Sequence, residues 1–137
     1  MSNPVSRSGG RVAIDASLHD LYKELTEGKD IEKAPFLTMK DVFMLAVCLG
    51  YRRGQRKPIA GKQQQIFHWA QFSDQVDVPI LKAIAIAVTG DVLVLSDFGK
   101  VVELAEEYAN AGIHEVRTKV ADYSGEPLWG LVDLVRG

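Results

Sequence analysis

From Thr38 to Pro58 the chain reads TMKDVFMLAVCLGYRRGQRKP, an apolar run that leads into a basic turn. A threonine followed three residues later by an acid is typical of a helix start, because each side chain can bond the other's backbone amide. Thr38 and Asp41 therefore predict a helix that begins at Met39 and runs to about Arg53. Its apolar positions are numerous enough to pack against more than one neighbour, so we expect it to be the central helix of the fold.

Three small residues within this stretch carry further expectations. Gly50 and Gly54 are predicted to end the helix, because glycine leaves the right-handed helical conformation without steric cost. Cys48 lies in the middle of the apolar run, where a free thiol usually behaves as a small buried hydrophobe. It is the sole cysteine, so we expect no disulfide within the monomer.

Hydrophobic spacing and capping residues predict further helices on both sides of the central one. They are a short amphipathic helix over residues 18–28, a helix from Asp77 to Gly90 that is buried nearly all round, a helix from Asp97 that Asn110-Ala111-Gly112 terminates, and a final apolar helix over residues 128–135. The sequence does not decide the secondary structure of three other segments. Residues 59–72 suit a strand or an irregular loop, residues 91–95 suit a strand or a helical turn, and residues 113–122 suit a further short helix or a strand.

These elements predict a mainly α fold, a compact single-domain bundle of about five helices with at most a small β element. A chain of 137 residues is long enough to bury one substantial core, but hardly two. Residues 1–10 are small and polar, and we expect them to form a flexible N-terminal arm. Residues 11–137 are then the single helical domain.

The composition is that of an ordinary globular protein, with 47% hydrophobic and 25% charged residues and a formal net charge of -2. A net negative charge excludes the whole-protein basic field typical of nucleic-acid binders, so any DNA contact has to come from a local patch. The N-terminus lacks the apolar core of a signal peptide, and no apolar run approaches the roughly 18 residues of a membrane span. The sequence therefore predicts a cytoplasmic protein without membrane contact.

Catalytic motifs are missing from the sequence. His19, His68 and His114 are scattered, and no pair of metal-binding residues has a recognised ligand spacing. Neither a Walker-type phosphate loop nor a Gly-Xaa-Ser-Xaa-Gly nucleophile elbow occurs. Asp91 and Asp97 each precede an apolar run, so helix capping explains them better than paired-carboxylate chemistry. We expect no enzymatic activity, no metal and no cofactor.

Four cations follow the central helix within six residues: Arg52, Arg53, Arg56 and Lys57. Such side chains bind phosphate oxygens, so the cluster is a candidate DNA-backbone or anion site. Two other interpretations stay open. The cations can stabilise the helix through its dipole, or they can pair with acidic residues of the chain or of a partner.

Aromatic residues supply a second candidate site. Phe67, Trp69 and Phe72 can stack on bases beside the basic turn, but such residues more often belong to the core or to a protein interface. We assign Phe67, Trp69, Phe72 and, on the apolar last helix, Trp129 to a partner interface. That apolar last helix also favours a homodimer, because two-fold pairs are the commonest way to cover such a surface.

Three groups of residues resemble a known family. They are residues 36–46 (FLTMKDVFMLA) with Leu49-Gly50-Tyr51, Gly54, Arg56 and Pro58; residues 85–91, which contain Thr-Gly-Asp; and residues 106–110 with Gly112. The pattern is similar to a small accessory protein family associated with the bacterial dnd system of DNA phosphorothioation. It extends over residues 36–112, and the segment from Lys62 to Phe72 departs from it. The resemblance implies an accessory protein encoded with DNA-modification and phage-restriction machinery, and it carries over no catalytic residues.

The sequence thus predicts a non-catalytic accessory component of a bacterial DNA-modification and phage-defence (restriction) system that acts by protein–protein binding. Its expected partners are other proteins of the same system, and DNA-backbone contact at the four cations is an additional hypothesis. The alternative is a stand-alone DNA-binding transcriptional regulator. The affinity of such a regulator for DNA falls with salt in proportion to the number of phosphates that it neutralises.

Overall fold

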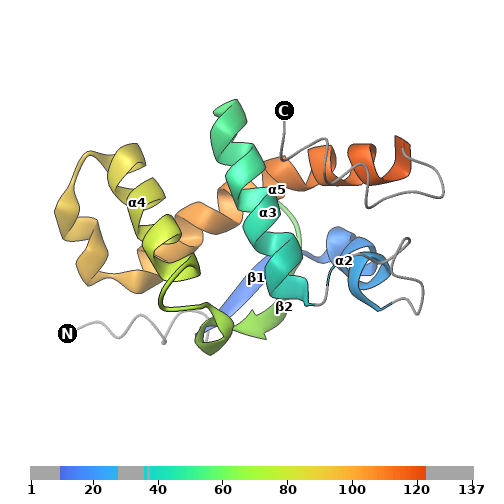
Figure 1. The fold of residues 1–137 in the computed structure, drawn as a ribbon, viewed down its shortest axis with the longest axis horizontal. Helices are drawn as coiled ribbons and strands as arrows, with labels where there is room; N and C mark the ends of the chain where they lie inside the picture. The colour runs from blue at the N-terminus through green and yellow to red at the C-terminus, as the bar shows by residue number, and fades with distance from the viewer. Residues whose placement is uncertain (1–9, 28–35, 37, 123–137) are drawn as a thin grey trace.

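The computed structural model describes residues 10–27, 36 and 38–122, and helices dominate it (Figure 1). In chain order the elements are β1 (Arg11–Asp15), the 3₁₀ helix η1 (Ala16–Leu18), α2 (His19–Thr26), α3 (Met39–Arg53), β2 (Gln63–His68), the 3₁₀ helix η2 (Trp69–Gln71), α4 (Asp77–Thr89), the 3₁₀ helix η3 (Val92–Ser96) and α5 (Phe98–Asp122). The prediction of a mainly α fold with a small β element is confirmed.

Three predictions lie outside the described residues: residues 1–9 of the expected arm, the helix expected at 128–135, and Trp129. No helix within the described ranges combines the length and the apolar character needed to span a bilayer.

The central helix α3 begins and ends at the expected residues. The Thr38 hydroxyl oxygen accepts a hydrogen bond from the Asp41 amide, and the Asp41 carboxylate accepts one from the Thr38 amide, each at 3.2 Å. Gly54 follows the last turn in the left-handed conformation, with φ at 65°. Local capping chemistry therefore decides both ends of this helix.

The prediction that Gly50 ends α3 is wrong, because this glycine is buried inside the helix. The same holds for Asn110 and Gly112, since α5 continues well beyond them. A Cβ atom on Gly50 would collide with the carbonyl oxygen of Tyr108, and one on Gly112 with that of Ala46. These two glycines therefore serve the close crossing of α3 and α5, and they do not terminate either helix.

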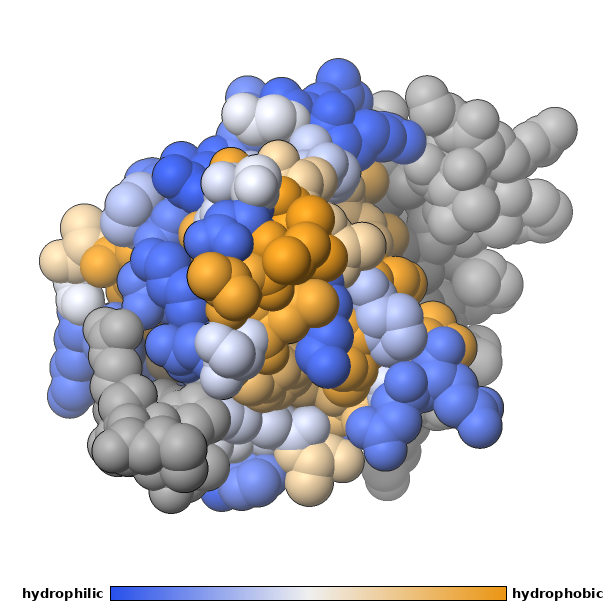
Figure 2. Space-filling model, turned by 90° about the vertical axis from the view of Figure 1, so that its left-hand side faces the viewer, coloured by the Kyte–Doolittle hydropathy of each residue, from blue (hydrophilic) through white to orange (hydrophobic). Residues whose placement is uncertain are grey.

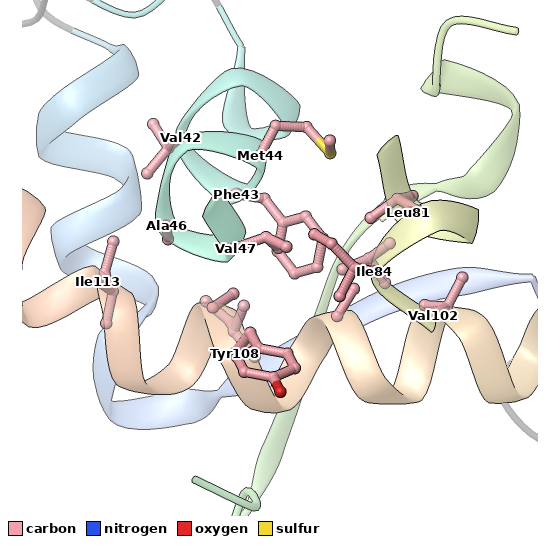
Figure 3. Packing of buried hydrophobic residues seen from close by; sticks show 14 of the residues in the cluster. Val42, Phe43, Met44, Ala46, Val47, Leu81, Ile84, Val102, Tyr108 and Ile113 are labelled. Carbon is pink, nitrogen blue, oxygen red and sulfur yellow. The ribbon is translucent and has the colours of Figure 1, made fainter. Parts of the chain in front are cut away.

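Most of the hydrophobic core lies where α3 meets α5 and α4 (Figure 3). In the close-up, Phe43 and Val47 of α3 point into the space between α5 and α4, where Leu81 and Ile84 of α4 meet them. Phe43 and Val47 have no exposed surface. α3 is therefore packed on more than one neighbour, as its wide apolar surface requires.

The small β element is an antiparallel pair of β1 and β2 whose register shifts between Val12 and Ala13. At this irregularity the carboxylate of Glu106 on α5 accepts a hydrogen bond of 2.7 Å from the Ala13 amide. Nothing in the sequence pattern predicts β1, because Val12, Ala13 and Ile14 are all buried and the strand shows no alternation. Residues 59–72, which the sequence left open, contain the strand β2 and the short helix η2.

Residues 91–95 follow one of their expected alternatives, whereas residues 113–122 form neither a separate short helix nor a strand. Residues 91–95 contain a helical turn, η3, and residues 113–122 are the last part of α5. Asp91 and Asp97 accept hydrogen bonds from the backbone amides two and three residues ahead, at 2.9 and 3.2 Å. The interpretation of both aspartates as caps therefore agrees with the structure.

Two predictions of burial are wrong. Cys48 is exposed, because it lies on the side of α3 that turns away from α5. α4 buries only one side, through Leu81, Ile84 and Ala85, and Ile80 lies on its solvent side. The run of apolar residues in α4 suggested burial all round, but only one side of the helix packs against the core.

Candidate functional site

Two of the predicted cations, at the C-terminal end of α3, pair with one glutamate of α5. Arg53 donates two hydrogen bonds to the Glu115 carboxylate, at 2.7 Å from Nη2 and 3.3 Å from Nε. Arg52 Nη2 lies 3.5 Å from the same carboxylate. The hydrogen bond from Arg53 and the charge of Glu115 raise the pKa of Arg53 above its usual value. Glu115 therefore holds both arginines at the end of α3.

The other two cations lie on the turn after α3, and α5 binds this turn as well. Arg56 Nε lies 3.1 Å from Glu107 Oε1, and the amide of Lys57 donates to the Glu107 carbonyl oxygen at 3.0 Å. The side-chain amide of Asn110 donates to the carbonyl oxygens of Lys57 and Pro58, at 3.0 and 3.3 Å. The arginines thus pair with acids of the chain itself, one of the interpretations that the sequence left open. We call Arg52, Arg53, Arg56 and Lys57 the basic turn.

The basic turn remains partly accessible to solvent. The side chain of Arg53 is 57% exposed, and those of Arg52 and Arg56 are each 42% exposed. Lys57 is exposed as well. An anion can therefore contact this surface, but it has to compete with the two glutamates of α5 for the arginines.

The aromatic residues expected at a partner interface lie mostly in the core. Phe67 and Phe72 are 2% and 5% exposed, their ring centroids lie 5.3 Å apart, and both rings contact Phe43. Trp69 is half-buried and packs edge to face against Phe98 at 5.2 Å. Buried rings neither contact a partner nor stack on bases. The assignment of Phe67 and Phe72 to a partner interface is therefore wrong, because both residues belong to the hydrophobic core.

A hollow of about 280 Å³ opens beside Trp69, between β1, the turn before β2 and α5. Its wall carries Glu103, Glu106 and Glu107, and the indole N–H of Trp69 is buried beside it without a hydrogen-bond partner in the described part of the chain. Glu106 accepts a hydrogen bond from the Ala13 amide of β1, and Glu107 pairs with Arg56 of the basic turn. Among the residues that the structure describes, no group of three or more metal-ligating side chains is placed to hold an ion. Glu106 and Glu107 thus hold neighbouring elements in place, whereas Glu103 lies 3.6 Å from Lys100 Nζ of the same helix.

An exposed apolar surface that the sequence did not predict lies on α4, on the residue just before it and on η3. Figure 2 views this side of the molecule and shows apolar residues gathered near the middle of the view, with hydrophilic residues around them. The exposed fractions are 57% for Val76, 36% for Ile80, 65% for Val92 and 73% for Leu93. We call these four residues and the exposed Ala83 and Ala87 the α4–η3 face. A contiguous exposed apolar surface is a common mark of an interaction site.

Comparison with protein families adds a biological context to this geometry. The profile of the family described as DNA sulphur modification system-associated protein 4 matches residues 11–130. The chain belongs to this family. No curated protein and no solved structure matched the chain.

The match to DNA sulphur modification system-associated protein 4 spans every described element from β1 to α5. It therefore includes the basic turn and the α4–η3 face. It also confirms the resemblance to the dnd-associated accessory family, whose motifs lie between residues 36 and 112. The family description associates the chain with a DNA sulphur modification system and states no reaction or ligand.

Proposed function

We propose that this protein is a non-catalytic accessory component of a bacterial DNA sulphur modification and restriction system, and that it acts in the cytoplasm by binding another protein of that system. Membership of the system-associated family carries the proposal. The α4–η3 face supports binding as the mode of action, because it presents large apolar side chains to solvent. Glu106 and Glu107 of the hollow are engaged with β1 and the basic turn, which favours a structural role for these two acids over catalysis.

The test is an affinity purification of the tagged full chain from a host that carries its own modification system, with and without nuclease. Retention of an identified protein of the system after nuclease treatment supports the proposal. Retention of DNA alone, lost with nuclease or at high salt, contradicts it and favours a DNA-binding regulator. Retention of neither contradicts both functions.

Direct contact with the DNA backbone at the basic turn is a second candidate, either beside a protein partner or as a stand-alone transcriptional regulator. The partial exposure of three arginines at one end of α3 favours it. Their pairing with the glutamates of α5 lowers the local charge, and the formal net charge of -2 supplies no wider basic field. We therefore rank DNA contact below protein binding.

Glu115→Gln separates the two candidates, because it removes the carboxylate charge beside Arg52 and Arg53 without removing a cation. If these arginines contact phosphate, the variant binds a short DNA duplex more tightly than the wild type. Lys57→Gln then binds the duplex more weakly, and the salt dependence of its affinity decreases by the amount expected for the loss of about one phosphate contact. Glu24→Gln, at an exposed acid of α2, is the matched control for the change in net charge. If the wild type and the three variants all bind the duplex with equal affinity, the basic turn does not contact DNA and the second candidate function is wrong.

A further inference from the structure

The α4–η3 face has the residue spacing of a helix-packing seam. Ile80, Ala83 and Ala87 of α4 are separated by three and four residues, and Val76, the residue just before the helix, lies four residues before Ile80; all four are exposed. This alternation places side chains in one stripe along a helix, and seams between packed helices use it. Ala83 and Ala87 add little bulk, so the axis of another helix can approach to about 8 Å, the lower end of the usual range.

Val92 and Leu93 add two large apolar side chains on η3, which packs on α4. Gly90 turns the chain at the end of α4 in the left-handed conformation, with φ at 68°. Asp91 then caps η3 by accepting a hydrogen bond of 2.9 Å from the Leu93 amide. These local bonds hold the two side chains outward in one arrangement, which reduces the ordering entropy lost when a partner binds.

The opposite side of α4 is anchored, so the helix cannot turn to bury its stripe. Leu81 and Ile84 lie in the core, 1% and 7% exposed (Figure 3). At the start of the helix the buried Asp77 carboxylate lies 2.8 Å from Lys40 Nζ of α3. The same carboxylate accepts a hydrogen bond of 2.8 Å from the Ser73 amide. Core packing and this ion pair therefore keep the stripe facing solvent.

Acidic side chains border the α4–η3 face. Asp74 lies two residues before Val76, and Asp91 and Asp97 flank η3; all three aspartates are exposed. Lys82 is the one basic residue in the sequence of α4. A surface that complements this border is basic. A two-fold pair of copies would bring the same acids together in one interface, so the charge favours a different protein over a second copy.

We infer that the α4–η3 face receives an amphipathic helix from another protein of the sulphur modification system, a helix whose apolar stripe is flanked by lysine or arginine. The inference rests on the proposed function, since it names the surface and the chemistry by which the accessory protein binds. The apolar stripe of the partner helix packs along Ile80 and the two alanines, beside Leu93. Its flanking cations lie against the aspartates of the border.

The test co-expresses the tagged full chain with each protein of its modification system in turn and measures the dissociation constant of any complex that survives nuclease. Ala83→Arg places a long charged side chain where the helices approach most closely, and Leu93→Ser removes the most exposed apolar side chain of the face. Each is expected to weaken the complex about tenfold or more, as central interface residues do. Ala60→Arg makes the same substitution at an exposed alanine in the turn before β2, and its complex is expected to keep the wild-type affinity.

Asp74→Lys tests the contribution of the acidic border. This variant is expected to weaken the complex several-fold and to reduce the salt dependence of its affinity. Thermal melts followed by circular dichroism establish that each variant is folded, as expected for exposed positions. A complex that tolerates Ala83→Arg, Leu93→Ser and Asp74→Lys overturns the inference and leaves the proposed function standing. A wild-type chain that forms no complex overturns the proposed function itself. A wild-type dimer that Ala83→Arg dissociates identifies a second copy as the occupant, and it too overturns the inference.

Discussion

The α-carbon of Gly112 on α5 faces the backbone amide of Gly50 on α3, so closely that a Cβ atom on Gly112 would lie 2.6 Å from that amide nitrogen. The two helices therefore cross with backbone against backbone, which glycine alone permits. This crossing positions α5, and α5 carries Glu107 and Glu115. The arrangement of the basic turn thus depends on a contact between two residues that have no side chain.

Gly112→Ala is expected to lower the free energy of unfolding by about 3 kcal/mol or more, because the added methyl group has to displace the backbone of a packed helix. Chemical denaturation followed by far-UV circular dichroism measures the change. Gly61→Ala is the matched control, since the nearest atom to its Cβ would be a carboxylate oxygen of Asp15 at 3.9 Å. The control is expected to change the free energy by no more than about 0.5 kcal/mol. A Gly112→Ala protein as stable as the wild type would refute the close crossing.

The sequence predicts correctly those elements whose ends depend on neighbouring residues. Thr38 and Asp41 cap α3 through each other's amides, and Gly54 ends it, so a window of about twenty residues contains all the information. Gly50 and Gly112 match the local pattern of a helix end equally well. Their role depends on a helix some sixty residues away in the chain, and no local rule contains that contact.

The candidate site likewise combines residues that the sequence identifies with contacts that depend on residues far away in the chain. The cations of the basic turn can be named from the sequence, but Arg53 and its partner Glu115 are 62 residues apart. The aromatic residues Phe67 and Phe72 are equally suited to a core and to an interface, and only the position of Phe43 decides for the core. α4 is apolar enough to be buried all round, yet its stripe is exposed because the core lies on one side of it alone.

Asp77→Asn is expected to lower the free energy of unfolding by about 1–3 kcal/mol, because it removes the charged partner of Lys40 at a position that is 6% exposed. Urea denaturation measures the loss. Asp74→Asn, at an exposed acid of the same segment, is expected to stay within about 0.5 kcal/mol of the wild type. Adding Lys40→Met to Asp77→Asn should cost little more, since the pair is already broken. Fully additive losses would show that the two side chains do not act together.

High pH is expected to destabilise the fold through two groups. The hydrogen bond to Asp77 is the main cause that raises the pKa of Lys40, and burial raises the pKa of Tyr22. Unfolded lysine and tyrosine titrate near pH 10, at about 10.4 and about 10. Both groups therefore stabilise the folded state fully below those values, and their contribution is lost as the pH rises through the raised folded-state pKa values.

Unfolding free energies measured in urea at a series of pH values test this expectation. The wild type should hold a steady value up to about pH 9 and lose stability above about pH 10. Tyr22→Phe and Lys40→Met should each flatten part of that decline. If the decline is equally steep in both variants, other groups cause it.

Asn110→Ala is expected to loosen the basic turn while leaving all its cations in place. The side chain of Asn110 is 9% exposed, and its amide donates to the carbonyl oxygens of Lys57 and Pro58. Losing these bonds should cost about 1–3 kcal/mol of unfolding free energy. The Lys57 amide, which donates to the Glu107 carbonyl oxygen, should then exchange its hydrogen faster, whereas amides in the middle of α4 keep their rates after correction for global stability.

Residue-resolved hydrogen exchange of the wild type and Asn110→Ala measures this difference. An unchanged rate at Lys57 would mean that the Glu107 contacts alone hold the turn. Because the variant keeps every cation, it also separates charge from geometry in any ligand that the basic turn binds. A ligand that needs the fixed arrangement of the cations binds Asn110→Ala more weakly, since the turn has to be reordered on binding. A ligand that responds to charge alone binds both proteins equally.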